Sequence, residues 1–191
     1  MIRPRFTLTV AATADGFIAK GPGHAPADWV SAEEQALFFR DVEAADWSVL
    51  GRGTHEAAPR RDRRRIVFSA QVAGWQTECQ FWCDPRGRVP ADLAREVEKV
   101  HPLRHGLILG GTRVHDWFLA HAAIDHVHLT VEPVVWGAGL PTFTGAGRTD
   151  PVAAFTDRGF VVVEEVPLNA RGTRWVRLVP EAQAAELGHE E

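Results

Sequence analysis

The sequence lacks several features that would place the protein in a membrane, on nucleic acid or at a metal. Among its 191 residues, no apolar run approaches the roughly 20 residues that a membrane-spanning helix requires. The formal net charge is −4, whereas a nucleic-acid-binding protein usually needs a basic face. The only two cysteines, Cys79 and Cys83, have no second pair that would complete a zinc site. We therefore expect neither a membrane nor nucleic acid nor a metal ion as partner.

The amino-terminal segment is basic and then apolar, as a signal peptide would be, but its apolar part is short. Thr7 and Thr9 interrupt it, and Phe6, Leu8 and Val10 alternate with them. Such period-2 alternation is typical of a β-strand. Without a signal peptide, we expect a cytoplasmic protein whose two thiols are free.

Length and patterning predict one α/β domain. The composition, 45% hydrophobic and 24% charged, is typical of a soluble globular domain. Strand-like runs alternate with helix-like stretches, which predicts a central, mostly parallel sheet with flanking helices and an antiparallel hairpin at the carboxyl-terminal end. We expect this domain to cover residues 1–180 and a polar tail, with some frayed helix, to cover residues 181–191.

Hydrophobic periodicity places the individual elements. We expect strands at residues 6–11, 47–50, 66–69, 81–82, 107–109, 126–135, 160–168 and 173–179. We expect helices at residues 31–45, 90–100 and 112–122. In the first helix, Ala32, Ala36, Phe39 and Val42 or Glu43 follow helical spacing, and residues 169–172 form the hairpin turn between the last two strands.

Two strand-to-helix turns carry two glycines, a threonine and an arginine each. They contain Gly51, Arg52, Gly53 and Thr54, and Gly110, Gly111, Thr112 and Arg113. The start of a helix presents unpaired N–H groups and a positive dipole end, and glycine lets a phosphate come close to them. Arginine pairs with phosphate through two hydrogen bonds. Two such turns at neighbouring strand ends would bracket the pyrophosphate of a dinucleotide.

Glycines at such turns also occur only because the backbone bends there. Neither turn matches the full G-x-G-x-x-G fingerprint or a Walker A loop. The phosphate-binding interpretation therefore depends on the two turns occurring together.

Five segments in order resemble the dihydrofolate reductase-like superfamily and are most similar to the RibD C-terminal family, the reductase domain of riboflavin-biosynthesis enzymes. They are A-T-A-D-G-F-I-A (12–19), A-D-W-S-V-L-G-R-G-T (45–54), I-V-F-S (66–69), L-I-L-G-G-T-R-V-H-D-W-F-L (107–119) and I-D-H-V-H-L-T-V-E-P-V-V-W-G-A-G-L-P-T-F (124–143). The resemblance implies an NADPH-dependent reductase of a pterin-like or aminopyrimidine-like heterocycle.

The same resemblance assigns roles to single residues. It implies that the two glycine turns bind the phosphates of NADPH, with Arg52 and Ser69 near the adenosine 2′-phosphate. It places the nicotinamide near Ala11, Ala12 and the Asp15–Gly16 turn. It also implies a homodimer that pairs through late strands, for which the segment Ile124 to Val135 is the expected contact.

Two departures from the family pattern leave a second function open. Riboflavin-pathway reductases commonly have a lysine directly after the Asp-Gly pair, where this chain has Phe17. The chain also has no deaminase zinc signature. A nucleotide-binding or regulatory module without reductase chemistry is the alternative, because a fold alone does not fix function.

Hydride transfer needs a proton donor or polarising group, and Asp15 and Glu34 are the candidates. Glu34 stands where the acidic pterin-binding residue lies in the resembling enzymes, but Ser31-x-x-Glu34 is equally a helix capping box. Asp15 is equally a turn residue before Gly16. As further substrate contacts we expect Asp15, Trp29 and Thr130, although a mid-strand threonine often has only a structural role.

Two clusters of ionisable residues have ordinary explanations. His126 and His128 share one strand face, but no further ligand stands at a convincing metal spacing, so we interpret them as surface or interface histidines. The arginine-rich run at residues 60–65 would attract an anionic cofactor, although a solvated loop explains it equally well.

Overall fold

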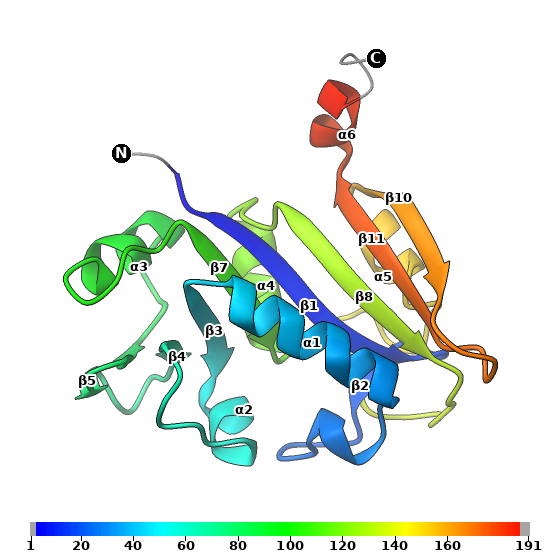
Figure 1. Ribbon diagram of the computed structural model, residues 1–191, viewed down its shortest axis with the longest axis horizontal. Coiled ribbons are helices and arrows are strands. Elements are labelled where there is room, and N and C mark those ends of the chain that lie inside the picture. The colour runs from blue at the N-terminus through cyan, green and yellow to red at the C-terminus, as the bar shows by residue number, and fades with distance from the viewer. Residues whose placement is uncertain (1–2, 188–191) are drawn as a thin grey trace.

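A nine-stranded sheet forms the centre of the molecule, with the strand order β10-β11-β8-β1-β7-β3-β4-β6-β5 (Figure 1). The computed structural model describes residues 3–187. The strands of the sheet are β1 (Arg5–Thr13), β3 (Trp47–Gly51), β4 (Arg65–Phe68), β5 (Gly74–Thr77), β6 (Gln80–Cys83), β7 (His105–Gly110), β8 (His126–Glu132), β10 (Phe160–Pro167) and β11 (Arg174–Pro180). Two short strands, β2 (Phe17–Ala19) and β9 (Leu140–Pro141), form a separate antiparallel pair.

Helices cover both faces of the sheet. They are η1 (Pro26–Asp28, a 3-10 helix), α1 (Ala32–Ala44), α2 (Arg52–Ala57), α3 (Pro90–Val97), α4 (Thr112–Ala120), α5 (Ala153–Thr156) and α6 (Glu181–Leu187). In Figure 1, α1 lies in front of the sheet, whereas α4 and α5 lie behind it. The sequence pattern did not predict the shortest elements, which have two to four residues and are too short to show a hydrophobic period. They are β2, β5, β9, η1 and α5.

The predicted mixture of parallel and antiparallel strands is confirmed. β1 pairs in parallel with β7 and β8, β3 with β4 and β7, and β4 with β6. The predicted hairpin of β10 and β11 is antiparallel and joins β8. A further antiparallel pair, β5 and β6, was not expected. Because five pairs are parallel, the carboxyl ends of β1, β3, β4, β6, β7 and β8 meet at one edge of the sheet.

The face of the sheet that α4 covers is apolar. Phe6, Leu8, Val10 and Ala12 of β1 belong to the main hydrophobic cluster. The rings of Phe6 and Phe118, the latter on α4, lie 4.8 Å apart. Successive side chains of a strand point to opposite faces, so the intervening residues of β1 face α1.

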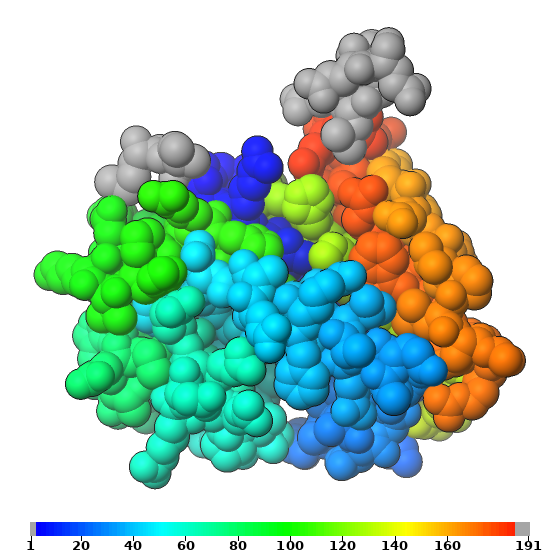
Figure 2. All heavy atoms as spheres, viewed as in Figure 1, coloured from blue at the N-terminus to red at the C-terminus, as the bar shows by residue number. Residues whose placement is uncertain are grey.

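The face under α1 is polar, and this corrects one expectation. Phe39, which belongs to the predicted apolar stripe of this helix, is 46% exposed, and Ala32, Ala36 and Glu43 are exposed as well. The buried residues of α1 are instead Glu34 and Asp41, which are 5% and 7% exposed. The prediction failed because alanine spacing marked a helical stripe without saying which stripe faces the sheet. Figure 2 shows α1 across this face, between α2 and the β10–β11 hairpin.

In the segment Ile124 to Val135, the apolar side chains of β8 are buried inside the chain, but Val135 at the end of the segment is 61% exposed. Its strand β8 lies between β1 and β11, and Val127 and Leu129 are fully buried within the chain. Less apolar surface is thus exposed at this segment than expected, and both the homodimer and its contact at this segment stay predictions. Beyond Pro180, α6 covers residues 181–187 of the expected tail, and residues 188–191 lie outside the described part.

Within residues 3–187, every helix is too short or too polar to span a bilayer.

Candidate active site

The two glycine turns lie side by side at the carboxyl edge of the sheet. β3 and β7 are neighbours, and Leu50 stands opposite Gly110. A Cβ atom added to Gly51 would lie 3.5 Å from Cγ2 of Val114 and 3.9 Å from the carbonyl oxygen of Gly110. The structure thus brings together two turns that are about 60 residues apart in the sequence.

Both turns leave helix N–H groups free of side-chain caps. Gly51 and Gly111 are the N-cap residues of α2 and α4, and neither has a side chain that could accept from the first turn. A Cβ atom added to Gly53 or Gly111 would meet no atom within 4 Å, so the space beside both turns is open. Uncapped donors beside open space fit a phosphate group.

The second turn is supported from below by its own helix and by β9. The Gly110–Gly111 peptide bond is cis, and Gly110 has a positive φ of 97°. Thr112 donates a hydrogen bond of 2.6 Å to the carbonyl oxygen of Pro141, so its hydroxyl proton serves the fold. Arg113 is exposed and forms no ion pair within residues 3–187. Of these two side chains, Arg113 is the one that is free to meet an anion.

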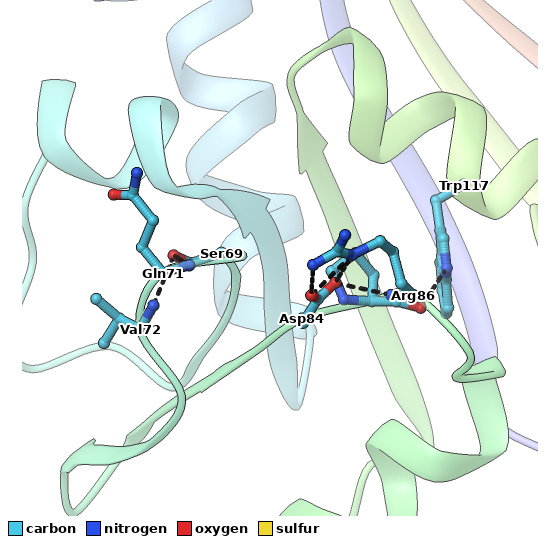
Figure 3. Close-up of polar contacts among 7 residues, drawn as sticks. Ser69, Gln71, Val72, Asp84, Arg86 and Trp117 are labelled. Atoms are coloured by element: carbon cyan, nitrogen blue, oxygen red, sulfur yellow. Dashed lines mark hydrogen bonds and ion pairs between the residues drawn. The ribbon is translucent and has the colours of Figure 1, made fainter.

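Arg52 and Ser69 meet through Gln71, a residue that the sequence pattern did not single out. The Arg52 guanidinium donates to the Gln71 side chain. Oγ of Ser69, just beyond β4, accepts hydrogen bonds of 3.2 Å from the backbone N–H groups of Gln71 and Val72 (Figure 3). Ser69 thereby shapes the turn, and Arg52 lies beside it. This geometry is compatible with a shared anion site, because among residues 3–187 the only carboxylate that Arg52 or Ser69 contacts is Glu56, which lies 3.6 Å from Arg52.

A second polar group lies beyond the end of β6, also in Figure 3. Arg86 forms an ion pair of 2.5 Å with Asp84, which together with backbone bonding holds the pKa of Asp84 below its usual value. Trp117 of α4 donates to the carbonyl oxygen of Pro85 at 3.1 Å and so fixes this loop to the helix. Because Asp84 neutralises Arg86, this guanidinium is a weaker anion ligand than Arg52 or Arg113.

The arginine run at residues 60–65 lies at the opposite edge of the sheet, before β4 rather than after it. Arg65 is buried and donates to the carbonyl oxygen of Ala58, at the end of α2, at 2.8 Å. An arginine at a helix carboxyl terminus stabilises the last carbonyl groups. The run therefore does not border the glycine turns.

The residues at the end of β1 are better suited to binding and anchoring than to donating a proton. The Ala12 side chain is fully buried in the apolar core, which leaves only its backbone for a cofactor. The Asp15 carboxylate accepts hydrogen bonds from Thr13 Oγ1 (2.8 Å) and from the N–H groups of Gly137 (2.7 Å) and Trp136 (3.2 Å). Burial raises the pKa of Asp15, but these bonds outweigh it and lower the pKa. An ionised, fully bonded carboxylate fits an anchoring role better than proton donation.

The Glu34 side chain does not cap its helix, because only half of the expected capping box forms. Ser31 Oγ accepts from the N–H of Glu34 at 3.3 Å, as a capping residue does. The N–H of Ser31, however, donates to Glu132 at 2.7 Å instead of to Glu34. The Glu34 carboxyl, on a residue only 5% exposed, has no hydrogen-bond partner within residues 3–187. The capping and functional interpretations are thus compatible.

The surroundings of Glu34 favour its protonated form. Burial, and then the nearby charges of Glu132 and Asp41, raise its pKa to about 7. A carboxyl group with this pKa exists in both forms at neutral pH, which is what general acid catalysis requires.

Thr130 lies in β8, whereas Trp29 directly follows η1. Thr130 is buried and pairs with Ala11 of β1 and Trp175 of β11. Trp29 packs edge-on against Trp136 at 4.7 Å, and its Nε1 is buried without a hydrogen-bond acceptor in the described chain. It also lines a cavity of about 380 Å³ together with Val30, Ser31, Glu132, Pro133, Val134, Arg171 and Thr173. Substrate contact by either residue stays a prediction.

The two strand histidines are not simple surface residues. Nδ1 of His128 lies 2.6 Å from Oδ2 of Asp41, and its ring lies 5.2 Å from that of Trp175. His126 is half-buried, and burial lowers its pKa. Across the described chain, no group of three or more metal-ligating side chains stands together.

Comparisons with known proteins agree with this architecture. The family model of the RibD C-terminal domain matches residues 4–166. The uncharacterized protein YwjB of Bacillus subtilis (strain 168) is 31% identical over 147 residues, covering 71% of this chain and 80% of YwjB.

Two solved structures share the fold. One is the Thermotoga maritima diaminohydroxyphosphoribosylaminopyrimidine deaminase/5-amino-6-(5-phosphoribosylamino)uracil reductase, with a TM-score of 0.69 and 18% identity. The match covers 93% of this chain and 57% of that one, so the chain spans little more than half of it. The other is dihydrofolate reductase from Enterococcus faecalis, complexed with NADP(H), with a TM-score of 0.64, 19% identity and coverage of 94% and 98%.

Proposed function

Because the chain belongs to the RibD C-terminal domain family, we propose that it is an NADPH-dependent reductase of a small heterocycle of the pterin or aminopyrimidine kind. Membership of this family supports a reductase-type activity at a general level. The observation that carries the finer proposal is Glu34, a buried carboxyl group without a partner in the described chain, on the helix that covers the carboxyl half of β1.

The residues at the carboxyl edge fit the phosphates of a dinucleotide. Gly51, Gly53, Gly110 and Gly111 leave open space beside uncapped helix N–H groups, and Arg52 and Arg113 supply positive charge. When bound there, NADPH supplies the hydride. In this proposal Arg52 selects the phosphorylated cofactor, because a guanidinium pairs with a phosphate in a way that a ribose hydroxyl does not allow.

Glu34 supplies the proton in this proposal. In its protonated form it donates a hydrogen bond and then a proton to a ring nitrogen next to the carbon that is reduced. In its ionised form it accepts a hydrogen bond from an amino or amide group of the same ring. Such a two-point contact favours a nitrogen heterocycle over a simple aldehyde or ketone. Phe17 is buried where related reductases carry a lysine, so no cation at that position selects a phosphorylated substrate.

A titration of tryptophan fluorescence tests cofactor binding. We expect saturable quenching by NADPH and weaker quenching by NADH. Arg52→Ala should raise the Kd for NADPH about tenfold and change that for NADH little. Arg60→Ala, at the opposite edge of the sheet, is the matched control and should change neither. Absence of binding by both cofactors would overturn the proposal.

Turnover separates a reductase from a binding module. NADPH oxidation is followed with a panel of oxidised pterins and aminopyrimidines. With a substrate that reacts, Glu34→Gln should lower turnover about 100-fold while the Kd for NADPH stays unchanged. Tight NADPH binding without oxidation by any heterocycle would instead support the nucleotide-binding module.

A further inference from the structure

Three carboxyl groups lie between α1 and the sheet, and two of them are fully bonded to the chain. Asp41 accepts from Thr9 Oγ1 at 2.8 Å and from His128 Nδ1 at 2.6 Å, and Arg40 lies 3.2 Å from its second oxygen. Glu132 accepts from the N–H of Ser31 and from Thr173 Oγ1, both at 2.7 Å.

The third carboxyl group, that of Glu34, stands between these two along the helix. Asp41 follows Glu34 by seven residues, two turns later on the same face. Glu132 bonds Ser31, which precedes Glu34 by three residues. Glu34 therefore has one buried carboxylate on each side and receives no hydrogen bond from the described residues.

The cations around this layer are engaged elsewhere. On α1, Arg40 reaches Asp41 from the surface. On β11, Arg177 pairs with Glu164 at 3.2 Å, and Arg171 in the hairpin turn lies 3.9 Å from Glu33. On β8, His128 bonds Asp41, and His126 lies two residues further from Glu34. No cation is paired with Glu34 in the described chain, so the charge of Glu132 acts on it directly, whereas Arg40 and His128 offset part of the charge of Asp41.

We propose that Asp41 and Glu132 are positioning residues whose charges hold a proton on Glu34, and this rests on the proposed role of Glu34 as the acid. Their own hydrogen bonds come from the chain, so they act on Glu34 through space. They need no contact with the reacting atoms of a substrate.

The electrostatics agree with this geometry. Burial contributes most to the raised pKa of Glu34, and the charges of Glu132 and Asp41 add to it. Burial also raises the pKa of Asp41, but the hydrogen bond and charge of His128, with the bonds from Thr9 and Arg40, outweigh it and lower the pKa. Asp41 consequently stays ionised over the range in which Glu34 titrates.

A direct titration of Glu34 by NMR tests the proposal without cofactor or turnover. Protein with ¹³C-labelled glutamate is titrated, and the Glu34 signal is assigned by its loss in Glu34→Gln. Glu132→Gln should lower the Glu34 midpoint by about one pH unit, and Asp41→Asn should lower it by less, because Arg40 and His128 offset part of the Asp41 charge. Glu43→Gln removes the same charge from the exposed side of α1 and should leave the midpoint in place.

The outcomes separate this proposal from the proposed function. If neither Asp41→Asn nor Glu132→Gln moves the midpoint, the positioning role is overturned even if the protein reduces a heterocycle. If the midpoint moves but NADPH does not bind, the proposed function fails and the electrostatic coupling stands. Should Asp41→Asn not fold, Glu132→Gln carries the test.

The rate profile provides a second measurement once a substrate is known. The alkaline limb of turnover should shift to lower pH in Asp41→Asn and return in Asp41→Glu, which restores the charge. If Asp41 had only a structural role, Asp41→Asn would lower the maximal turnover and leave the pH of the alkaline limb unchanged.

Discussion

A Cβ atom on Gly110 would lie 2.7 Å from Nε2 of His115, which is fully buried beneath the second glycine turn. Nδ1 of His115 lies 2.8 Å from the carbonyl oxygen of Thr142, and because a carbonyl oxygen only accepts, this nitrogen carries the proton. Burial lowers the pKa of His115 to about 4, so its ring is neutral at physiological pH. The neutral ring forms the floor of the turn, and only glycine leaves room for it.

The first prediction concerns this contact. Gly110→Ala should destabilise the protein by about 1–3 kcal/mol, because the new methyl group meets the His115 ring and the backbone has a positive φ. It should also weaken NADPH binding. Gly53→Ala is the matched control, since it meets no atom within 4 Å and stands in a helix, where alanine is favoured. Chemical denaturation compares the two, and equal stabilities would contradict the contact.

The second prediction separates an anchoring Asp15 from a catalytic one. Asp15→Asn should lower the free energy of unfolding by about 1–3 kcal/mol at neutral pH, because an amide replaces one acceptor oxygen with a donor. The folded pKa of Asp15 is lowered, so its stabilisation is present above the unfolded value of 3.8 and is lost as the pH falls through the folded pKa. The difference between wild type and variant should therefore shrink in acid. Unchanged stability with abolished turnover would instead make Asp15 a catalytic residue.

The third prediction concerns the pH dependence of stability. The folded pKa of Glu34, about 7, exceeds its ordinary value of 4.5, so between these values the folded state binds the proton and the unfolded state does not. Stability should fall as the pH rises through this window, by up to about 3 kcal/mol. Glu34→Gln should remove this slope and be more stable than wild type above it. Urea unfolding at several pH values measures the slope, and exposed Glu33→Gln, one residue earlier, should keep it.

The fourth prediction concerns the two thiols. Cys83 lies in β6, is 1% exposed, and burial raises its pKa to about 11, so it should not react in the folded protein. Cys79 is partly exposed before the same strand and should react. A chromogenic thiol reagent should therefore label one cysteine per native chain and two after denaturation. Two rapid labels in the native protein would contradict the burial of β6.

The sequence predicted those features that repeat along the chain or recur in a local motif. Alternation of Phe6, Leu8 and Val10 located β1, and the two glycine turns located neighbouring strand ends. Short elements such as β9 show no period, and the Gln71 contact of Arg52 depends on a turn conformation. These required the structure.

The environment of Glu34 could not be predicted from local sequence motifs. The pattern Ser31-x-x-Glu34 suggested a reciprocal cap, but the N–H of Ser31 bonds a carboxylate about 100 residues away in the sequence. Glu132 lies near this helix only because α1 packs across β1 and β8, whereas Asp41 shares the helix with Glu34. No spacing in the chain encodes the position of Glu132, and the apolar stripe of α1 even indicated the wrong face.

The polar underside of α1 has a consequence for motion. A helix that buries two carboxyl groups as its only buried residues gains little from the exclusion of water, and its attachment depends on directional bonds to the sheet. Its apolar residues Leu37, Phe38 and Val42 are only partly buried, so separating α1 from the sheet exposes less buried apolar side chain than separating α4, with its buried Val114 and Phe118, would. The amide hydrogens of the helix that carries the proposed acid should therefore exchange with deuterated solvent earlier than those of the strand beneath it.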